Sequence, residues 1–144
     1  MLTCNLLIKL KLHMNWEYRS SGFYMATSCR FSEYDLLELA QVTRELAQYS
    51  VTRFIRVYDF LKSCQQNPFI YQGLPFHNVT GFCVEDIIQE MLFDFRDRNQ
   101  NIYEIENLAM TTNNIKIKLL IEKIKPFYID EAELLLPSFK DYFL

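Results

Sequence analysis

Carboxylates at helical spacing are the residues of this sequence best placed to do chemistry. Asp86, Glu90 and Asp94 follow one another at intervals of four, so on a helix they would line one face about 6 Å apart. Such an array can bind a divalent cation or supply an acid–base pair. Arg98 lies four residues after Asp94 and can neutralise it, and the residues between have an ordinary amphipathic pattern. We therefore expect a solvent-exposed helix face.

His77 is the second candidate for acid–base chemistry. It lies in residues 67–81, which hold two prolines and two of the three glycines, and it could act as a general base if this loop covered a cleft. No nucleophile motif surrounds it, and the glycines form neither common phosphate-binding motif. We expect no catalytic residue, no cofactor and no metal site. An enzyme that uses His77 or the Asp86, Glu90 and Asp94 face is the third-ranked function.

Basic side chains offer a different chemistry, which is contact with nucleic acid. Arg53 and Arg56 share one face of a predicted helix, and Lys116 and Lys118 begin a denser basic cluster. Arginines among aromatic rings can follow a nucleic-acid backbone. The chain as a whole carries a net charge of −3, which argues against a broad basic face. We expect ordinary surface residues here, with an accessory subunit of a ribonucleoprotein as the alternative function.

Glycine is too scarce for a fold that depends on tight turns. Three glycines in 144 residues fall far below the average of about 7%, and hairpins and bulges use glycine for positive φ. The sequence therefore predicts a mainly α-helical protein, a compact bundle of about four or five helices.

Apolar periodicity places the predicted helices. Ser32 is a favourable N-cap, and apolar residues recur every three or four positions from there to about Cys64. Residues 115–125 fit a strand or a helix, and Asn114 as a cap favours the helix, which Pro126 should end. Further helices are expected at residues 83–98, 102–110 and 130–136.

Residues 1–31 are harder to interpret. Residues 6–13 alternate as a strand would, residues 23–31 are rich in β-forming types, and together they predict a hairpin, although the same leucines also fit a helix. We expect an N-terminal extension or β-hairpin ahead of a helical domain at residues 32–144. The alternative is an α+β fold with strands near 6–13 and 115–121.

The four cysteines and the N-terminal residues indicate the cellular compartment. The four cysteines have no metal-ligand spacing, so we expect four buried thiols in a reducing compartment. No apolar run is long enough to cross a membrane. We expect an intracellular, cytoplasmic protein with no membrane contact; organelle targeting by residues 1–24 is less favoured, because that stretch is poor in arginine.

The aromatic content suggests the function. Aromatic residues are 15% of the chain and are frequent anchors of protein interfaces. Phe139, Tyr142, Phe143 and Leu144 could offer an amphipathic end to a partner's groove. We expect a non-catalytic protein-binding module, either an adaptor, an inhibitor or a small accessory subunit. Its partner would be another protein, and a homo-oligomer stays open.

Overall fold

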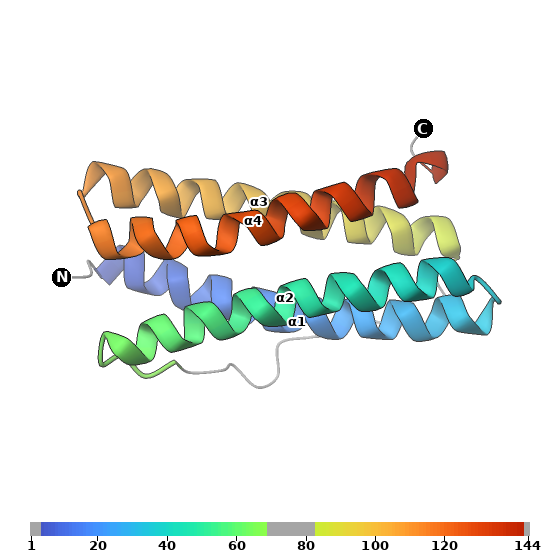
Figure 1. Ribbon diagram of the computed structural model, residues 1–144, viewed down its shortest axis with the longest axis horizontal. Coiled ribbons are helices and arrows are strands. Elements are labelled where there is room, and N and C mark those ends of the chain that lie inside the picture. The colour runs from blue at the N-terminus through green and yellow to red at the C-terminus, as the bar shows by residue number, and fades with distance from the viewer. Residues whose placement is uncertain (1–3, 69–82, 143–144) are drawn as a thin grey trace.

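The computed structural model describes residues 4–68 and 83–142, which form four long helices (Figure 1). These are α1 (Cys4–Glu33), α2 (Leu37–Ser63), α3 (Val84–Thr111) and α4 (Ile115–Ser138), followed by the short 3₁₀ helix η1 (Lys140–Tyr142). No strand occurs in these two stretches. The predicted helical bundle is confirmed.

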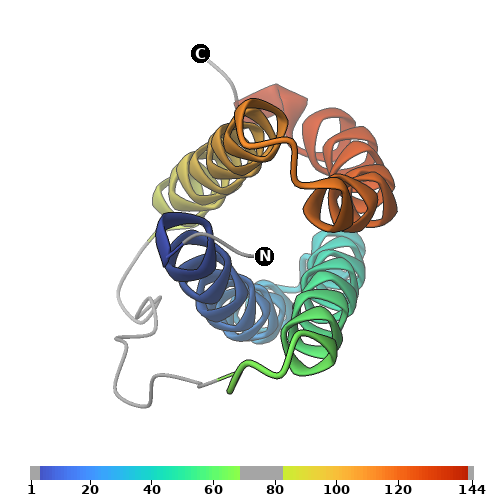
Figure 2. The same ribbon diagram turned by 90° about the vertical axis from the view of Figure 1, so that its left-hand side faces the viewer.

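The helices stand at the four corners of a bundle, as the view along its axis shows (Figure 2). α1 packs against α2 and α3, and α4 packs against the same two helices. α2 and α3 run in the same direction (Figure 1), so the connection of residues 64–83 joins opposite ends of the bundle. One long crossover of this kind defines a distinct class of four-helix bundle.

The first helix corrects the prediction for the N-terminal residues. The β-hairpin within residues 1–31 is wrong, and so is the α+β alternative, because residues 6–13 and 115–121 are both helical. Leu6, Leu10 and Met14 are fully buried, so their spacing of four determines the conformation and the apparent alternation does not. The boundary expected between residues 31 and 32 falls inside α1.

Three helix ends explain how the bundle manages with so little glycine. Asp35, Gln65 and Asn113 each adopt a left-handed conformation, with φ of 59°, 58° and 53°. After each, the next backbone N–H bonds back to a helix carbonyl, as from Leu36 to Phe31 at 2.9 Å. This is the Schellman motif, which glycine usually closes. Ser32, expected to start a helix, lies instead in the last turn of α1.

Gln65→Gly is expected to stabilise the protein by about 0.5 kcal/mol, because glycine adopts positive φ without a steric penalty. Asn113→Gly is the matched control at an equivalent position, where asparagine already tolerates this conformation, and its effect should be smaller. Urea unfolding of the two variants measures the difference. A loss of stability on Gln65→Gly would contradict this description of the helix end.

The last helix confirms one prediction and corrects another. Asn114 caps α4 by accepting a hydrogen bond from the Ile117 N–H at 3.1 Å, so the helix favoured for residues 115–125 is confirmed. Pro126 does not end it. Proline deprives the carbonyl of Glu122 of its partner, but both residues are exposed, so water can take the missing hydrogen bond.

The core is divided in two along the bundle axis. One apolar cluster holds Leu10, Leu61 and Ile121 among others, and a second holds Phe31 and Ile88 among others. Charged side chains from all four helices lie between the two clusters. Among the helices of residues 4–68 and 83–142, none is apolar enough along its length to span a bilayer.

Candidate functional site

A layer of buried charges crosses the middle of the bundle. We call it the central polar layer: Glu17 of α1, Arg53 of α2, Asp94 and Arg98 of α3, and Glu131 of α4. Four of these residues are fully buried and Asp94 is 6% exposed. Unpaired charges at such depth would be very costly, so the geometry of their pairing decides what this layer can do.

Arg53 joins three helices. Its Nε donates to Glu17 Oε1 at 2.9 Å, and its Nη2 donates to Glu131 Oε1 at 2.5 Å and to Ser50 Oγ at 3.2 Å. The guanidinium carbon also lies 4.0 Å from the centre of the Tyr128 ring, a favourable position for a cation. Arg53 thus ties α2 to α1 and α4.

Arg98 completes the layer from α3. Its Nε donates to Asp94 Oδ2 at 2.9 Å, its Nη2 to Glu131 Oε2 at 2.9 Å, and its Nη1 to Glu17 Oε2 at 3.4 Å. Glu17 and Glu131 therefore each contact both guanidinium groups. Three carboxylates face two guanidinium groups, so the five residues carry one net negative charge.

Two tyrosines supply neutral donors to this excess negative charge. Tyr24 OH donates to Glu131 Oε2 at 2.8 Å and accepts from Arg98 at 3.0 Å, and Tyr128 OH donates to Glu17 Oε1. Burial first, and then the adjacent carboxylate, raise the pKa of both tyrosines well above the ordinary value. Both phenols therefore stay protonated and act as donors.

Asp94 is held from a third direction. Trp16 Nε1 donates to its Oδ1 at 2.9 Å, and Ser20 Oγ donates to its Oδ2 at 2.7 Å. Both donors come from α1, so this carboxylate fastens α3 to α1. With Arg98 also donating, each oxygen of Asp94 has a protein partner.

A buried histidine extends the network beyond Glu17. The Asn101 amide lies 2.9 Å from His13 Nδ1, and His13 Nε2 lies 2.5 Å from Tyr128 OH. If Asn101 donates to Nδ1, the ring proton lies on Nε2. The chain of donors then runs from Asn101 through His13 and Tyr128 to Glu17. His13 is therefore used inside the protein as a link between side chains.

Two carboxylates of the layer, Glu17 and Asp94, are held ionised. Burial by itself would raise the pKa of Glu17, but the guanidinium groups of Arg53 and Arg98 hold it well below the ordinary value. Burial also opposes ionisation of Asp94, and Arg98 with the Trp16 and Ser20 donors outweighs it, which lowers the pKa of Asp94. Glu17 and Asp94 are thus ionised partners of the buried arginines.

The acidic residues singled out from the sequence do not form one face. Asp86 is exposed and Glu90 is half-buried, whereas Asp94 points into the core. The expected solvent-exposed face is therefore wrong for Asp94. Neutralisation by Arg98 is confirmed, but it takes place inside the bundle. His77 lies outside the described residues.

The basic residues expected to contact nucleic acid do not form one surface either. Arg53 is buried in the central polar layer, which corrects the expectation of a surface residue. Arg56 and Lys116 line one groove between α2 and α4, together with Lys123. Lys118 is half-buried and does not line that groove.

Two of the four residues expected to contact a partner protein, Phe139 and Tyr142, lie after the end of α4. Phe139 is fully buried and packs against the Phe31 ring, and Tyr142 closes η1. The side chain of Tyr142 and the whole of Phe143 and Leu144 lie outside the description. Cys29, Cys64 and Cys83 are free thiols; Cys29 and Cys83 are exposed and Cys64 is half-buried, where burial was expected.

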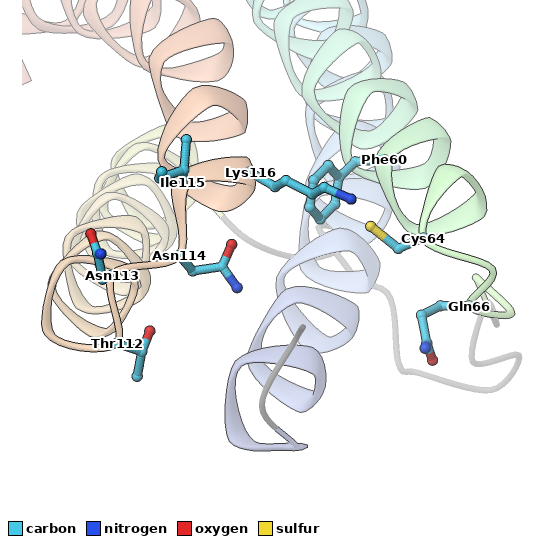
Figure 3. A pocket seen from close by; sticks show the side chains of 8 residues that line it. All are labelled: Phe60, Cys64, Gln66, Thr112, Asn113, Asn114, Ile115 and Lys116. Carbon is cyan, nitrogen blue, oxygen red and sulfur yellow. The ribbon is translucent and has the colours of Figure 1, made fainter.

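An open hollow of about 400 Å³ lies at one end of the bundle. Figure 3 shows that it is lined by the end of α2 and the residue after it, with Phe60 and Cys64, and by the connection into α4 and the first turn of that helix, with Asn114 and Lys116. Among the residues that the structure describes, the lining contains no carboxylate and no histidine. Cys64 is a single thiol among amide, hydroxyl and apolar side chains and Lys116, so these lining residues do not form a metal-binding set.

Comparisons with known proteins agree on the architecture. No family model matches the chain. Over 115 residues it is 27% identical to the bacterial non-heme ferritin-like protein of Escherichia coli K12, which covers 79% of this chain and 68% of that protein, and a protein of the same description from Shigella flexneri matches equally well.

Solved structures give the fold directly. A humanized archaeal ferritin superposes with a TM-score of 0.80 at 15% identity, covering 96% of this chain and 87% of that one. An open pore ferritin from the archaeon Archaeoglobus fulgidus gives a TM-score of 0.79 at 14% identity, covering 97% and 88%. The chain has the ferritin-like fold.

These findings overturn the function expected from the sequence. The adaptor, inhibitor or small accessory subunit is wrong, because the similar proteins are described as ferritins and ferritin-like proteins. The ribonucleoprotein alternative loses Arg53, which is buried, and the enzyme alternative loses the shared carboxylate face, because Asp94 points into the core. Whether the bundle itself could hold iron depends on the side chains that its helices direct inward.

The central polar layer does not suit a di-iron centre. Di-iron proteins of this fold direct a glutamate from each of two helices inward, and a Glu-x-x-His motif from each of the other two. Here α2 directs Ser50 and Arg53 inward at that same spacing of three, and neither can replace the glutamate or the histidine. Among the described residues, no group of three or more carboxylate, histidine or cysteine side chains is arranged to hold a metal.

Proposed function

We propose that this chain is the subunit of a ferritin-like iron-storage assembly made of copies of itself. The observation that carries the proposal is the similarity over 115 residues to bacterial non-heme ferritin-like proteins, on a chain with the ferritin-like fold. The free thiols of Cys29, Cys64 and Cys83 support an intracellular location for the storage.

Self-assembly is supported by an apolar strip on the outside of the bundle. Tyr18 and Met25 of α1 and Val51 and Ile55 of α2 are each between 42% and 48% exposed. Met25 and Val51 line a single groove between the two helices. Exposed apolar patches on a protein often mark an interface, and we call these four residues the outer α1–α2 strip.

The storage function is tested by loading purified protein with Fe(II) in air, removing free iron by gel filtration, and measuring iron, protein and molar mass in the same fraction. The proposal predicts a homo-oligomer that elutes with iron in large excess over its subunits. A monomer that elutes without iron would refute the proposal. A homo-oligomer that elutes without iron would refute the storage role.

Met25→Asp with Val51→Asp is expected to reduce the assembly to smaller species, because two carboxylates would be buried without partners at the interface. Light scattering coupled to size exclusion measures the molar mass. Met25→Leu with Val51→Ile keeps the strip apolar and is the matched control, which should assemble normally. Full-size assembly of the aspartate variant would show that another surface makes the contacts.

A further inference from the structure

We propose that Arg53 and Arg98 take the place of the metal ions in the interior of this ferritin-like bundle, so that the central polar layer holds no divalent cation and oxidises no Fe(II). This inference follows from the layer itself and goes beyond the storage function. If it holds, any oxidation of stored iron must take place outside the middle of the bundle.

The carboxylates of the layer have no oxygen to spare for a metal. Both oxygens of Glu17 and both oxygens of Glu131 accept from guanidinium N–H groups of Arg53 and Arg98. Asp94 accepts from Arg98, and its other oxygen is taken by a donor from α1. A metal could bind these groups only after several charge-assisted hydrogen bonds had broken, and these are the strong ones.

The two cations also cannot be removed by a change in protonation. An arginine guanidinium does not deprotonate in proteins, whereas a lysine or histidine in the same place could lose its charge and admit a metal. A divalent ion between Glu17 and Glu131 would lie beside two fixed positive charges that are themselves fully buried. The repulsion between the divalent ion and the two guanidinium groups would be strong, because these charges would be adjacent in a medium of low dielectric constant.

Two buried residues on α2, Ser50 and Arg53, stand where a metal-binding motif would have its ligands. Ser50 and Arg53 have the i, i+3 spacing of the Glu-x-x-His motif and are both fully buried. Ser50 keeps a small side chain that accepts from Arg53 at 3.2 Å and leaves room for the guanidinium. The pair thus supplies one positive charge where the motif would supply a metal-binding glutamate and histidine.

The experiment uses Co(II) without oxygen as the probe, because its visible spectrum reports bound carboxylate and histidine ligands. The native protein is titrated with Co(II) beside Glu17→Gln, and thermal unfolding is followed with Co(II) and with EDTA. The native spectrum should contain no band that Glu17→Gln removes. A Glu17-dependent band in the native protein would overturn the proposal, and this arm needs no redesigned variant to fold.

The second arm converts the layer. Ser50→Glu with Arg53→His and Arg98→Gln restores a Glu-x-x-His motif and removes both cations. This variant should gain a Co(II) spectrum that Glu17→Gln abolishes, and at a hundredfold excess of metal over the dissociation constant its Tm should rise by about 5–10 °C. A folded variant with no Co(II) band and no metal-dependent change in Tm would show that the arginines do not prevent metal binding.

These outcomes are independent of the storage test. Native protein that assembles and retains iron, without a Glu17-dependent Co(II) band, supports both proposals. Native protein with such a band overturns the present inference and leaves storage in place. Native protein that neither assembles nor retains iron refutes storage, while the Co(II) result still decides the nature of the interior.

Discussion

Arg53→Met is expected to lower the free energy of unfolding by about 3–5 kcal/mol, because it leaves buried carboxylates without their cation. Glu17 and Glu131 would each lose a guanidinium partner at 2.9 and 2.5 Å, in a place that water does not reach. For a chain of this size, the loss corresponds to a fall in Tm of roughly 10–20 °C. Urea and thermal unfolding both measure it.

Arg56→Met is the matched control for this prediction. Arg56 lies on the same helix, three residues later, but it is exposed, so its replacement should change the free energy of unfolding by less than about 0.5 kcal/mol. Equal effects of the two substitutions would contradict the assignment of Arg53 to a buried ion-pair layer.

The effects of substituting Arg53 and Glu131 on the free energy of unfolding are expected to be coupled. Glu131→Gln removes one of the two carboxylates that both arginines share, and after Arg53→Met that carboxylate is partly uncompensated. The double variant should therefore be less destabilised than the sum of the single variants, by about 0.5–3 kcal/mol. Simple additivity would indicate that the two side chains do not interact.

The second large effect is on acid stability. The pKa of Glu17 and the pKa of Asp94 are both lowered in the folded protein from ordinary values of 4.5 and 3.8. A carboxyl group with a depressed folded-state pKa contributes stability that is fully present above its unfolded pKa and is lost as the pH falls towards the folded one. Stability should therefore be steady down to about pH 5 and fall steeply below about pH 4.5.

Thermal unfolding between pH 7 and pH 3 measures this dependence. Glu17→Gln should be less stable than the native protein at pH 7 and should lose less stability on acidification, since one of the two titrating groups is gone. Glu122→Gln, at an exposed position, is the control and should follow the native profile. A native Tm that stays constant to pH 3 would contradict the ionised state of the layer.

The sequence was sufficient for the class of fold because helices leave strong local signals. The spacing of Leu6, Leu10 and Met14 was present in the sequence, but Lys9 and Lys11 between them produced an alternation that resembles a strand. Tertiary packing decides between the two patterns. The end of α1 was missed because Asp35 takes a left-handed conformation that glycine usually supplies. The ends expected near Cys64 and residue 110 agree with α2 and α3, which end at Ser63 and Thr111.

The central polar layer was missed because charged residues are normally at the surface. One signal was available in the sequence. On each helix, a charged residue interrupts a row of apolar positions, as Glu17 does after Leu10 and Met14, and as Arg53 does before Val57 and Leu61. A single interruption has little meaning, but one on every helix at the same level indicates a buried network. The charged residues of different helices can be assigned to the same level of the bundle only once the direction and register of the helices are known.

The space between Glu17 and Glu131 in the native protein holds either two guanidinium groups or metal. Diffraction data collected at the iron absorption edge, from crystals soaked in Fe(II) without oxygen, distinguish the two directly. We expect density for the two guanidinium groups and no anomalous peak within the central polar layer, whatever iron binds elsewhere. An anomalous peak bridged by Glu17 and Glu131, with Arg53 and Arg98 displaced, would contradict the account.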